Sequence, residues 1–187
     1  HDFPEQILPY DYEAYFNNPA RYVMVTTNCL TGEANYLEEK RRKERVIDIV
    51  RASSSLPFVC PIVRVDGIPM LDGGIVDSIP LAHALADGCT KAVVVLTRNL
   101  GYRKKIQGTR VPAFVYRKYP LLQQAINRRS VVYNGQLDLV ERLEAEGQAV
   151  VIRPKQPVQV DRIERDVHKL TALYDEGYRC GMELECL

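Results

Sequence analysis

Residues 65–80 read Val-Asp-Gly-Ile-Pro-Met-Leu-Asp-Gly-Gly-Ile-Val-Asp-Ser-Ile-Pro, and the rest of the chain is interpreted outward from them. Apolar residues on both sides of Asp66-Gly67 predict two short strands joined by a tight hairpin turn. The second strand should end at Asp72, where Gly73 and Gly74 permit positive φ angles and a close approach to the backbone. Asp72 is therefore expected on a strand-to-helix loop, where open α/β sheets gather their catalytic groups.

The residues that follow predict a helix and then a buried strand. Ser78 is a suitable N-cap, Pro80 suits a first turn, and Gly88 suits the end of a helix over residues 79–87. Residues 91–97 are almost wholly apolar, which is typical of a central parallel strand covered on both faces. Strand, helix and strand at this spacing predict a βαβ unit.

Asp72 admits two interpretations. Asp-Gly is a common turn signal, so the residue can serve the loop alone. The surrounding sequence favours a second role. It comprises Ile-Val-Arg-Ala-Ser-Ser-Ser-Leu-Pro-Phe at 49–58, Leu-Asp-Gly-Gly-Ile-Val-Asp-Ser-Ile-Pro at 71–80 and the strand Ala-Val-Val-Val-Leu-Thr at 92–97. These runs resemble the patatin-like phospholipase family.

The resemblance implies an α/β fold of three layers, with a mostly parallel sheet flanked by helices. It implies a lipid acyl hydrolase with a Ser–Asp dyad, in which Asp72 is the catalytic aspartate and Gly73 and Gly74 support it. It implies a lipid or acyl-ester substrate, no cofactor and no metal. His83 follows the motif closely, but the family's dyad uses no histidine, so His83 is not expected to act in catalysis.

Two motifs of that family do not occur among the 187 residues: a Gly-x-Ser-x-Gly nucleophile elbow and a glycine-rich oxyanion loop. We therefore expect residues 1–187 to be the C-terminal part of one patatin-like domain, with residues 134–187 as a helix–strand–helix extension. Such a chain would be inactive alone. The alternative is a noncatalytic α/β lipid-binding or interaction domain. A dinucleotide-binding domain is disfavoured, because no Gly-x-Gly-x-x-Gly follows a strand.

Composition narrows the class of protein. The chain has 25 Lys and Arg residues against 24 Asp and Glu, so its net charge does not indicate a particular class of binding partner. No apolar run is long enough to span a bilayer, and no signal peptide is visible. Five cysteines without a Cys-x-x-Cys pair favour free buried thiols in a reducing compartment, and a pair between Cys180 and Cys186 is the alternative. We expect a cytoplasmic protein, with peripheral membrane contact as an option.

The segment from Arg98 to Arg129 contains nine basic residues and no acidic residue. One interpretation is an exposed loop followed by a solvated helix face. The other is a patch that contacts an anionic membrane surface. Nucleic acid is disfavoured as a partner, because the total charge is balanced and no recognition motif occurs.

The remaining elements follow from periodicity and turn signals. Before the central motif we predict a short helix over 12–16, a hairpin from strands at 21–27 and 34–37, and a helix over 39–52 that ends at Ser53-Ser54-Ser55. These serines lack the glycines of a nucleophile elbow and are expected to be structural. After it we predict a helix over 120–129, a second helix capped by Asn134, a strand over 149–152 and a last helix from a cap at Asp161 to Gly181.

Overall fold

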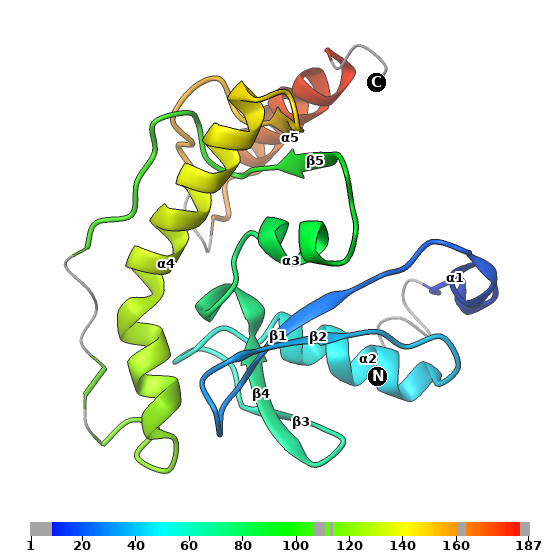
Figure 1. Cartoon of the computed structure of the whole chain (residues 1–187), viewed down its shortest axis with the longest axis vertical. Helices are drawn as coiled ribbons and strands as arrows, with labels where there is room; N and C mark the ends of the chain where they lie inside the picture. The colour runs from blue at the N-terminus through cyan, green and yellow to red at the C-terminus, as the bar shows by residue number, and fades with distance from the viewer. Residues whose placement is uncertain (1–8, 107–110, 113, 161–163, 184–187) are drawn as a thin grey trace. The chain divides into compact units, whose positions relative to one another are not determined.

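The computed structural model describes residues 9–106, 111–112, 114–160 and 164–183. The chain divides into two compact units, and Figure 1 shows its elements in order. The first unit comprises residues 1–79 and 106–133, and the second comprises residues 80–105 and 134–187. Among the described residues, no helix has the length and apolarity that crossing a membrane requires.

The first unit contains a four-stranded sheet in which every neighbouring pair is antiparallel. Its order is β2 (Ala34–Leu37), β1 (Met24–Asn28), β4 (Ile68–Asp72) and β3 (Val63–Val65). Val65 pairs with Ile68 across a two-residue turn. Both turn residues are left-handed, with φ of 51° at Asp66 and 80° at Gly67, as a type I′ turn requires. The predicted hairpins are confirmed.

Helix α2 (Lys43–Ser53) closes one apolar core of this unit. Met24 of β1 and Met70 of β4 contribute to the same buried cluster, together with Ile49, Ala52, Val63 and Val65. A second cluster lies around the end of β4 and comprises Cys29, Leu71, Ile75, Val111, Leu122 and Ile126. The loop after β4 therefore packs against buried side chains of β4 and of α4 (Pro120–Ala145).

Glu39 organises the start of α2, a role that the sequence did not indicate. Its carboxylate is buried and accepts hydrogen bonds from the backbone N–H groups of Lys40, Arg41 and Arg42 at 2.8–3.1 Å. Arg42 and Arg45 also reach its second oxygen. Burial alone would raise the pKa of Glu39, but these hydrogen bonds outweigh burial and lower the pKa to about 2. Glu39 thus pairs the donors ahead of the helix with a fixed negative charge.

Replacing Glu39 by Gln should destabilise the first unit by about 1–3 kcal/mol at pH 7, because partly buried backbone donors lose a charged acceptor. A lowered pKa contributes stability above the ordinary value near 4.5 and loses it as pH falls toward 2. The difference in unfolding free energy between wild type and variant should therefore shrink as the pH falls below about 4.5. Urea unfolding from pH 7 down to pH 3 measures it, with the exposed Glu44→Gln as control. An equal gap at both pH values would contradict the role of the charge.

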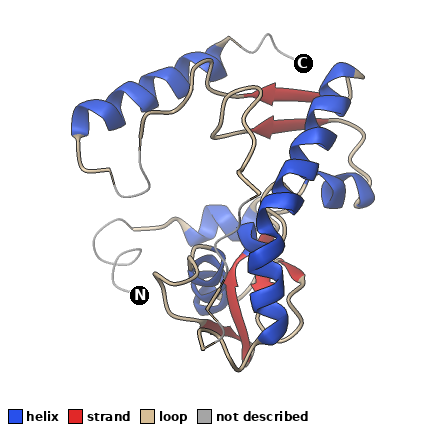
Figure 2. Cartoon of the chain, turned by 90° about the vertical axis from the view of Figure 1, so that its left-hand side faces the viewer, coloured by secondary structure: helices blue, strands red, loops and turns tan. Residues whose placement is uncertain are grey.

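The second unit contains a two-stranded parallel sheet. Strand β5 (Ala92–Val95) pairs with β6 (Ala149–Ile152) from Ala92↔Ala149 to Val95↔Ile152. Figure 2 shows the two strands pointing in the same direction. The unit also holds α3 (Leu81–Ala86), the C-terminal part of α4, and α5 (Val167–Met182).

The mixed α/β character predicted from the sequence is confirmed, but the three-layer, mostly parallel sheet is not. Strands joined by short turns can pair only in antiparallel fashion, and this applies to β1–β2 and to β3–β4. The predicted βαβ unit is wrong, because β4 and β5 belong to different sheets. Val93 and Val95 of β5 are 51% and 69% exposed, so its apolar run does not mark burial on both faces.

Two helix boundaries differ from the prediction, because the side chains that cap helices are not the ones expected. Asn134 was expected to begin a helix, but α4 continues through it as one element. The Asn134 amide instead exchanges hydrogen bonds with the backbone of Lys104, at 2.9 and 3.0 Å. Helix α5 begins at Val167 with Asp166 as its N-cap, whereas the predicted cap Asp161 lies outside the described residues. The short N-terminal helix is confirmed as α1 (Tyr12–Asn17).

Four of the five cysteines lie in the described residues, and all four are free thiols. Cys29 is buried in the core around the end of β4, and burial raises the pKa of its thiol to about 11. Cys60, Cys89 and Cys180 are partly or fully exposed. The predicted free state is confirmed for these residues, and burial is confirmed only for Cys29.

Candidate active-site loop

Asp72 is the last residue of β4, as predicted, and its backbone is held from two sides. Its N–H donates to the carbonyl oxygen of Ser55 at 2.9 Å. Its carbonyl oxygen accepts from the buried hydroxyl of Thr27 at 2.8 Å. Its Cα also pairs with Thr26 across the β1–β4 ladder. The backbone of the candidate acid is thus fixed by β1 and by the loop after α2.

The carboxylate of Asp72 is half-buried and turns back onto its own loop. Oδ1 accepts a hydrogen bond from the N–H of Gly74 at 2.7 Å, which makes Asp72 the N-cap of the 3₁₀ turn η2 (Gly73–Ile75). Within the part of the chain that the structure describes, no ion pair and no second hydrogen bond reaches this carboxylate. One oxygen is therefore positioned by the loop, while Oδ2 keeps its capacity to accept a proton.

The two glycines are needed for close approach rather than for a left-handed backbone, because neither has positive φ. A Cβ on Gly73 would lie 2.4 Å from the carbonyl oxygen of Val25 in β1. A Cβ on Gly74 would lie 3.1 Å from Oδ1 of Asp72. Glycine at position 73 lets the loop pack on the central strand, and glycine at position 74 leaves room for the carboxylate.

The loop is closed by hydrogen bonds to its own carbonyl groups. The carbonyl oxygen of Gly73 accepts from the N–H groups of Val76 and Asp77 at 3.0 and 2.8 Å. The hydroxyl of Tyr36 in β2 donates to Oδ2 of Asp77 at 2.5 Å. Burial and this hydrogen bond raise the pKa of Tyr36. Asp77 thus has a structural partner that Asp72 lacks, although both are carboxylates of one loop.

Ser78 does not cap α3, contrary to the prediction. The N-cap position of α3 is Pro80, and the Ser78 hydroxyl donates to the carbonyl oxygen of Gly74 at 2.7 Å. A serine hydroxyl can bond a carbonyl one turn earlier as readily as it caps a helix, and the tight turn at Gly73-Gly74 brings that carbonyl within reach. Ser78 therefore belongs to the loop over residues 72–78, which we call the Asp72 loop.

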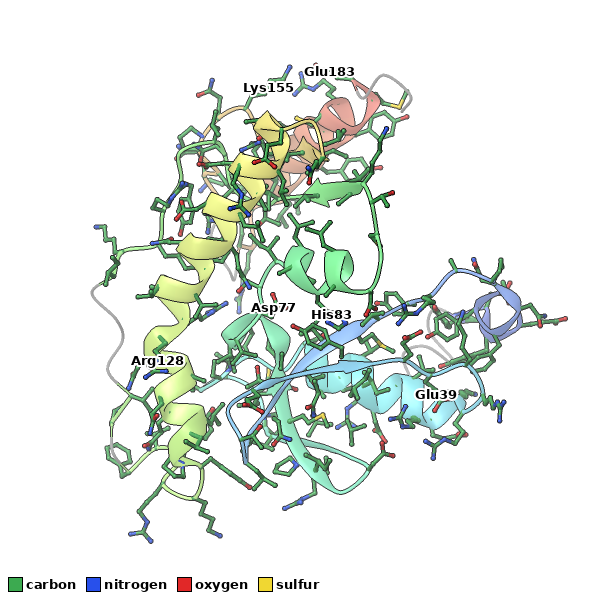
Figure 3. All side chains as sticks on the ribbon, in the orientation of Figure 1. Glu39, Asp77, His83, Arg128, Lys155 and Glu183 are labelled. Carbon is green, nitrogen blue, oxygen red and sulfur yellow. The ribbon has the colours of Figure 1, made fainter. Side chains whose placement is uncertain are left out.

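The other candidate side chains have structural partners. Ser53 and Ser55 donate to the carbonyl oxygens of Val25 and Arg51, which confirms their structural interpretation. Figure 3 labels His83 on α3, where its Nε2 lies 3.7 Å from a carboxylate oxygen of Asp87 one turn later.

The basic segment from Arg98 to Arg129 is partly neutralised by residues outside it. Arg103 contacts Asp138 and Glu141 of α4 at 2.9 and 2.8 Å. The contact holds the pKa of Glu141 below its usual range. Arg98 lies over the ring of Tyr102. A sequence window cannot show that acids from a later helix pair with a basic segment, and contact of the segment with a membrane stays a prediction.

Three cavities bordered by described residues lie away from Asp72. One of about 460 Å³ lies beside α1 and is bordered by Tyr10, Tyr15 and Tyr22. The other two, of about 460 and 670 Å³, lie in the second unit, and Arg153 and Lys155 border both.

Comparison with known proteins gives partial matches at both ends of the chain. Residues 119–184 match a domain of unknown function, DUF6363, and residues 13–85 match the model described as patatin-like phospholipase. A stretch of 56 residues is 43% identical to the uncharacterized protein YjjU of Escherichia coli strain K12. That stretch covers 29% of this chain and only 16% of YjjU. The Asp72 loop lies inside residues 13–85, and the match there supports a place for this part of the chain in the patatin-like phospholipase family.

Proposed function

We propose that this chain supplies the general base, Asp72, to a patatin-like lipid acyl hydrolase whose nucleophilic serine lies outside residues 1–187. The observation that carries the proposal is the Asp72 carboxylate. Its Oδ1 is held by the N–H of Gly74, and among the described residues its Oδ2 has no partner and no ion pair neutralises the carboxylate. The match of residues 13–85 to patatin-like phospholipases supports the same reaction class.

The reaction follows from the needs of a serine nucleophile. A serine hydroxyl attacks an ester carbonyl only when a base accepts its proton. In the proposed reaction Asp72 takes that proton as the Oγ–carbonyl bond forms, and then returns it to the alcohol as the ester C–O bond breaks. The same carboxylate next activates a water molecule, which hydrolyses the acyl-serine. General-base assistance of this kind raises rates by about 100- to 10,000-fold.

The proposal predicts that residues 1–187 have no esterase activity alone, because a base without its nucleophile cannot start acyl transfer. Purified chain should hydrolyse p-nitrophenyl butyrate no faster than buffer and should not react with a fluorophosphonate probe. The natural protein that contains these residues should hydrolyse the ester and be labelled on one serine. Serine-dependent turnover by residues 1–187, or an inert natural protein, would overturn the proposal.

A noncatalytic lipid-binding or interaction domain is the second candidate. The observation in its favour is that no Gly-x-Ser-x-Gly occurs in the 187 residues. The reading frame of the natural gene distinguishes the two candidates. A Gly-x-Ser-x-Gly motif encoded in frame with these residues supports the hydrolase, and a reading frame without this motif supports the binding domain.

A further inference from the structure

Arg129 of α4 contacts the Asp72 loop within the first unit. Its Nε donates a hydrogen bond of 2.7 Å to the carbonyl oxygen of Gly74. The two residues are 55 positions apart in the sequence, and the contact is partly buried. Arg129 itself is half-buried, whereas the neighbouring Arg128 is exposed and is labelled on α4 in Figure 3.

Gly74 connects this arginine to the candidate base. Its carbonyl oxygen accepts from Arg129 and from the Ser78 hydroxyl, each at 2.7 Å, so both lone pairs are used. Its N–H donates to Oδ1 of Asp72, also at 2.7 Å. Fixing the carbonyl of Gly74 therefore limits rotation of the residue whose N–H orients the carboxylate.

The space around Gly74 shows how closely the three side chains converge. A Cβ built on this glycine would lie 3.1 Å from Oδ1 of Asp72 and 3.6 Å from both Nη2 of Arg129 and Oγ of Ser78. Among the described contacts, Arg129 bonds the carbonyl oxygen of Gly74 and no ion pair joins it to Asp72. A direct ion pair would engage the oxygen that must accept a proton, whereas a contact through Gly74 leaves it open.

We propose that Arg129 is a positioning residue for the reaction, which holds the Asp72 carboxylate in its productive orientation through Gly74. The proposal rests on the function proposed for Asp72. It also links the two matched segments, because Asp72 lies in residues 13–85 and Arg129 lies in residues 119–184. The segment of unknown function would then stabilise the base of the hydrolase.

Arginine suits this role better than lysine. The planar guanidinium presents donors in a fixed fork, so Nε can bond a carbonyl while Nη2 remains beside the loop. A lysine ammonium carries the charge on a flexible stem and would keep the electrostatic effect without the directed hydrogen bond. The two substitutions therefore separate charge from geometry.

The experiment uses the natural protein and a soluble short-chain nitrophenyl ester. Arg129→Met should lower kcat by about 10- to 100-fold with little change in KM, since small displacements of a catalytic group have effects of this size. Arg129→Lys should recover only part of the rate. The matched control Arg128→Met removes an exposed charge from the next position of α4 and should leave kcat and the melting temperature unchanged. Normal kcat in Arg129→Met would overturn the proposal.

A double-mutant cycle with Asp72→Asn separates positioning from general stability. If Arg129 acts through Asp72, then Arg129→Met should cause no further loss of rate in the Asp72→Asn background. Equal fold-losses in both backgrounds would show that Arg129 acts elsewhere and would overturn the proposal. The function proposed for Asp72 fails by a different result, namely full activity of Asp72→Asn itself.

Discussion

Asp72→Asn should reduce kcat/KM of the natural protein for a soluble ester by at least about 100-fold, because the variant loses its general base. The folded structure should survive the change. An asparagine amide oxygen can accept the hydrogen bond from the Gly74 N–H in place of Oδ1, and no described ion pair is lost. The backbone bonds of residue 72 to Ser55 and Thr27 are unaffected by the side chain. Ester hydrolysis and thermal unfolding of the same preparation measure both expectations.

Asp77→Asn is the matched control for this prediction. Asp77 belongs to the same loop and is also half-buried, but its carboxylate accepts the hydroxyl of Tyr36. An amide oxygen can still accept that hydrogen bond, so activity should stay within a few-fold of wild type. Full activity in Asp72→Asn with a normal melting temperature would place the base elsewhere. Equal losses in both variants would indicate a general effect of loop charge.

Gly73→Ala should unfold or severely destabilise the first unit, by about 3 kcal/mol or more. The new Cβ would lie 2.4 Å from the carbonyl oxygen of Val25 and 2.8 Å from its Cβ. A flexible side chain could move aside, but here the obstacle is the backbone of the central strand β1. That carbonyl also accepts the Ser53 hydroxyl, so its displacement breaks a second contact. Urea denaturation of the 187-residue chain measures the loss.

Two other glycines separate steric crowding from backbone conformation. Gly67→Ala adds a Cβ in open space at φ of 80° and should cost about 1 kcal/mol through left-handed strain alone. Gly135→Ala adds a Cβ in open space within α4 and should stabilise the helix by up to about 1 kcal/mol. If Gly73→Ala were no worse than Gly67→Ala, the close packing of the loop on β1 would be refuted.

Features with local causes could be predicted from the sequence. The Asp66-Gly67 turn and the end of β4 at Asp72 depend on neighbouring residues, and both are confirmed. The free state of the described cysteines and the structural role of Ser53 and Ser55 were also within reach. In each case turn chemistry or residue spacing contains the information.

Features with distant causes could not be predicted. Nothing near Arg129 indicates that it will bond a carbonyl 55 positions earlier. Likewise, nothing near Asn134 indicates that its amide will hydrogen-bond the backbone of Lys104. Pairing direction failed for the same reason. The apolar run of β5 is compatible with a central parallel strand, but which strands become neighbours depends on the whole fold. A basic arginine such as Arg129 has no sequence signature that separates it from its exposed neighbour Arg128.

The position of Asp72 depends on the number of residues in the Asp66-Gly67 turn, because this turn sets how β3 pairs with β4. Side chains alternate along β3, with Val63 and Val65 buried on either side of the exposed Arg64. One inserted residue in the turn would oblige a strand to shift by one position, and such a shift exchanges the faces of all its side chains. Either β3 would turn its valines to solvent, or β4 would exchange Met70 and Leu71 between the two apolar clusters and turn Asp72 to the opposite face. Single insertions here should be far less tolerated than paired ones, which restore the alternation.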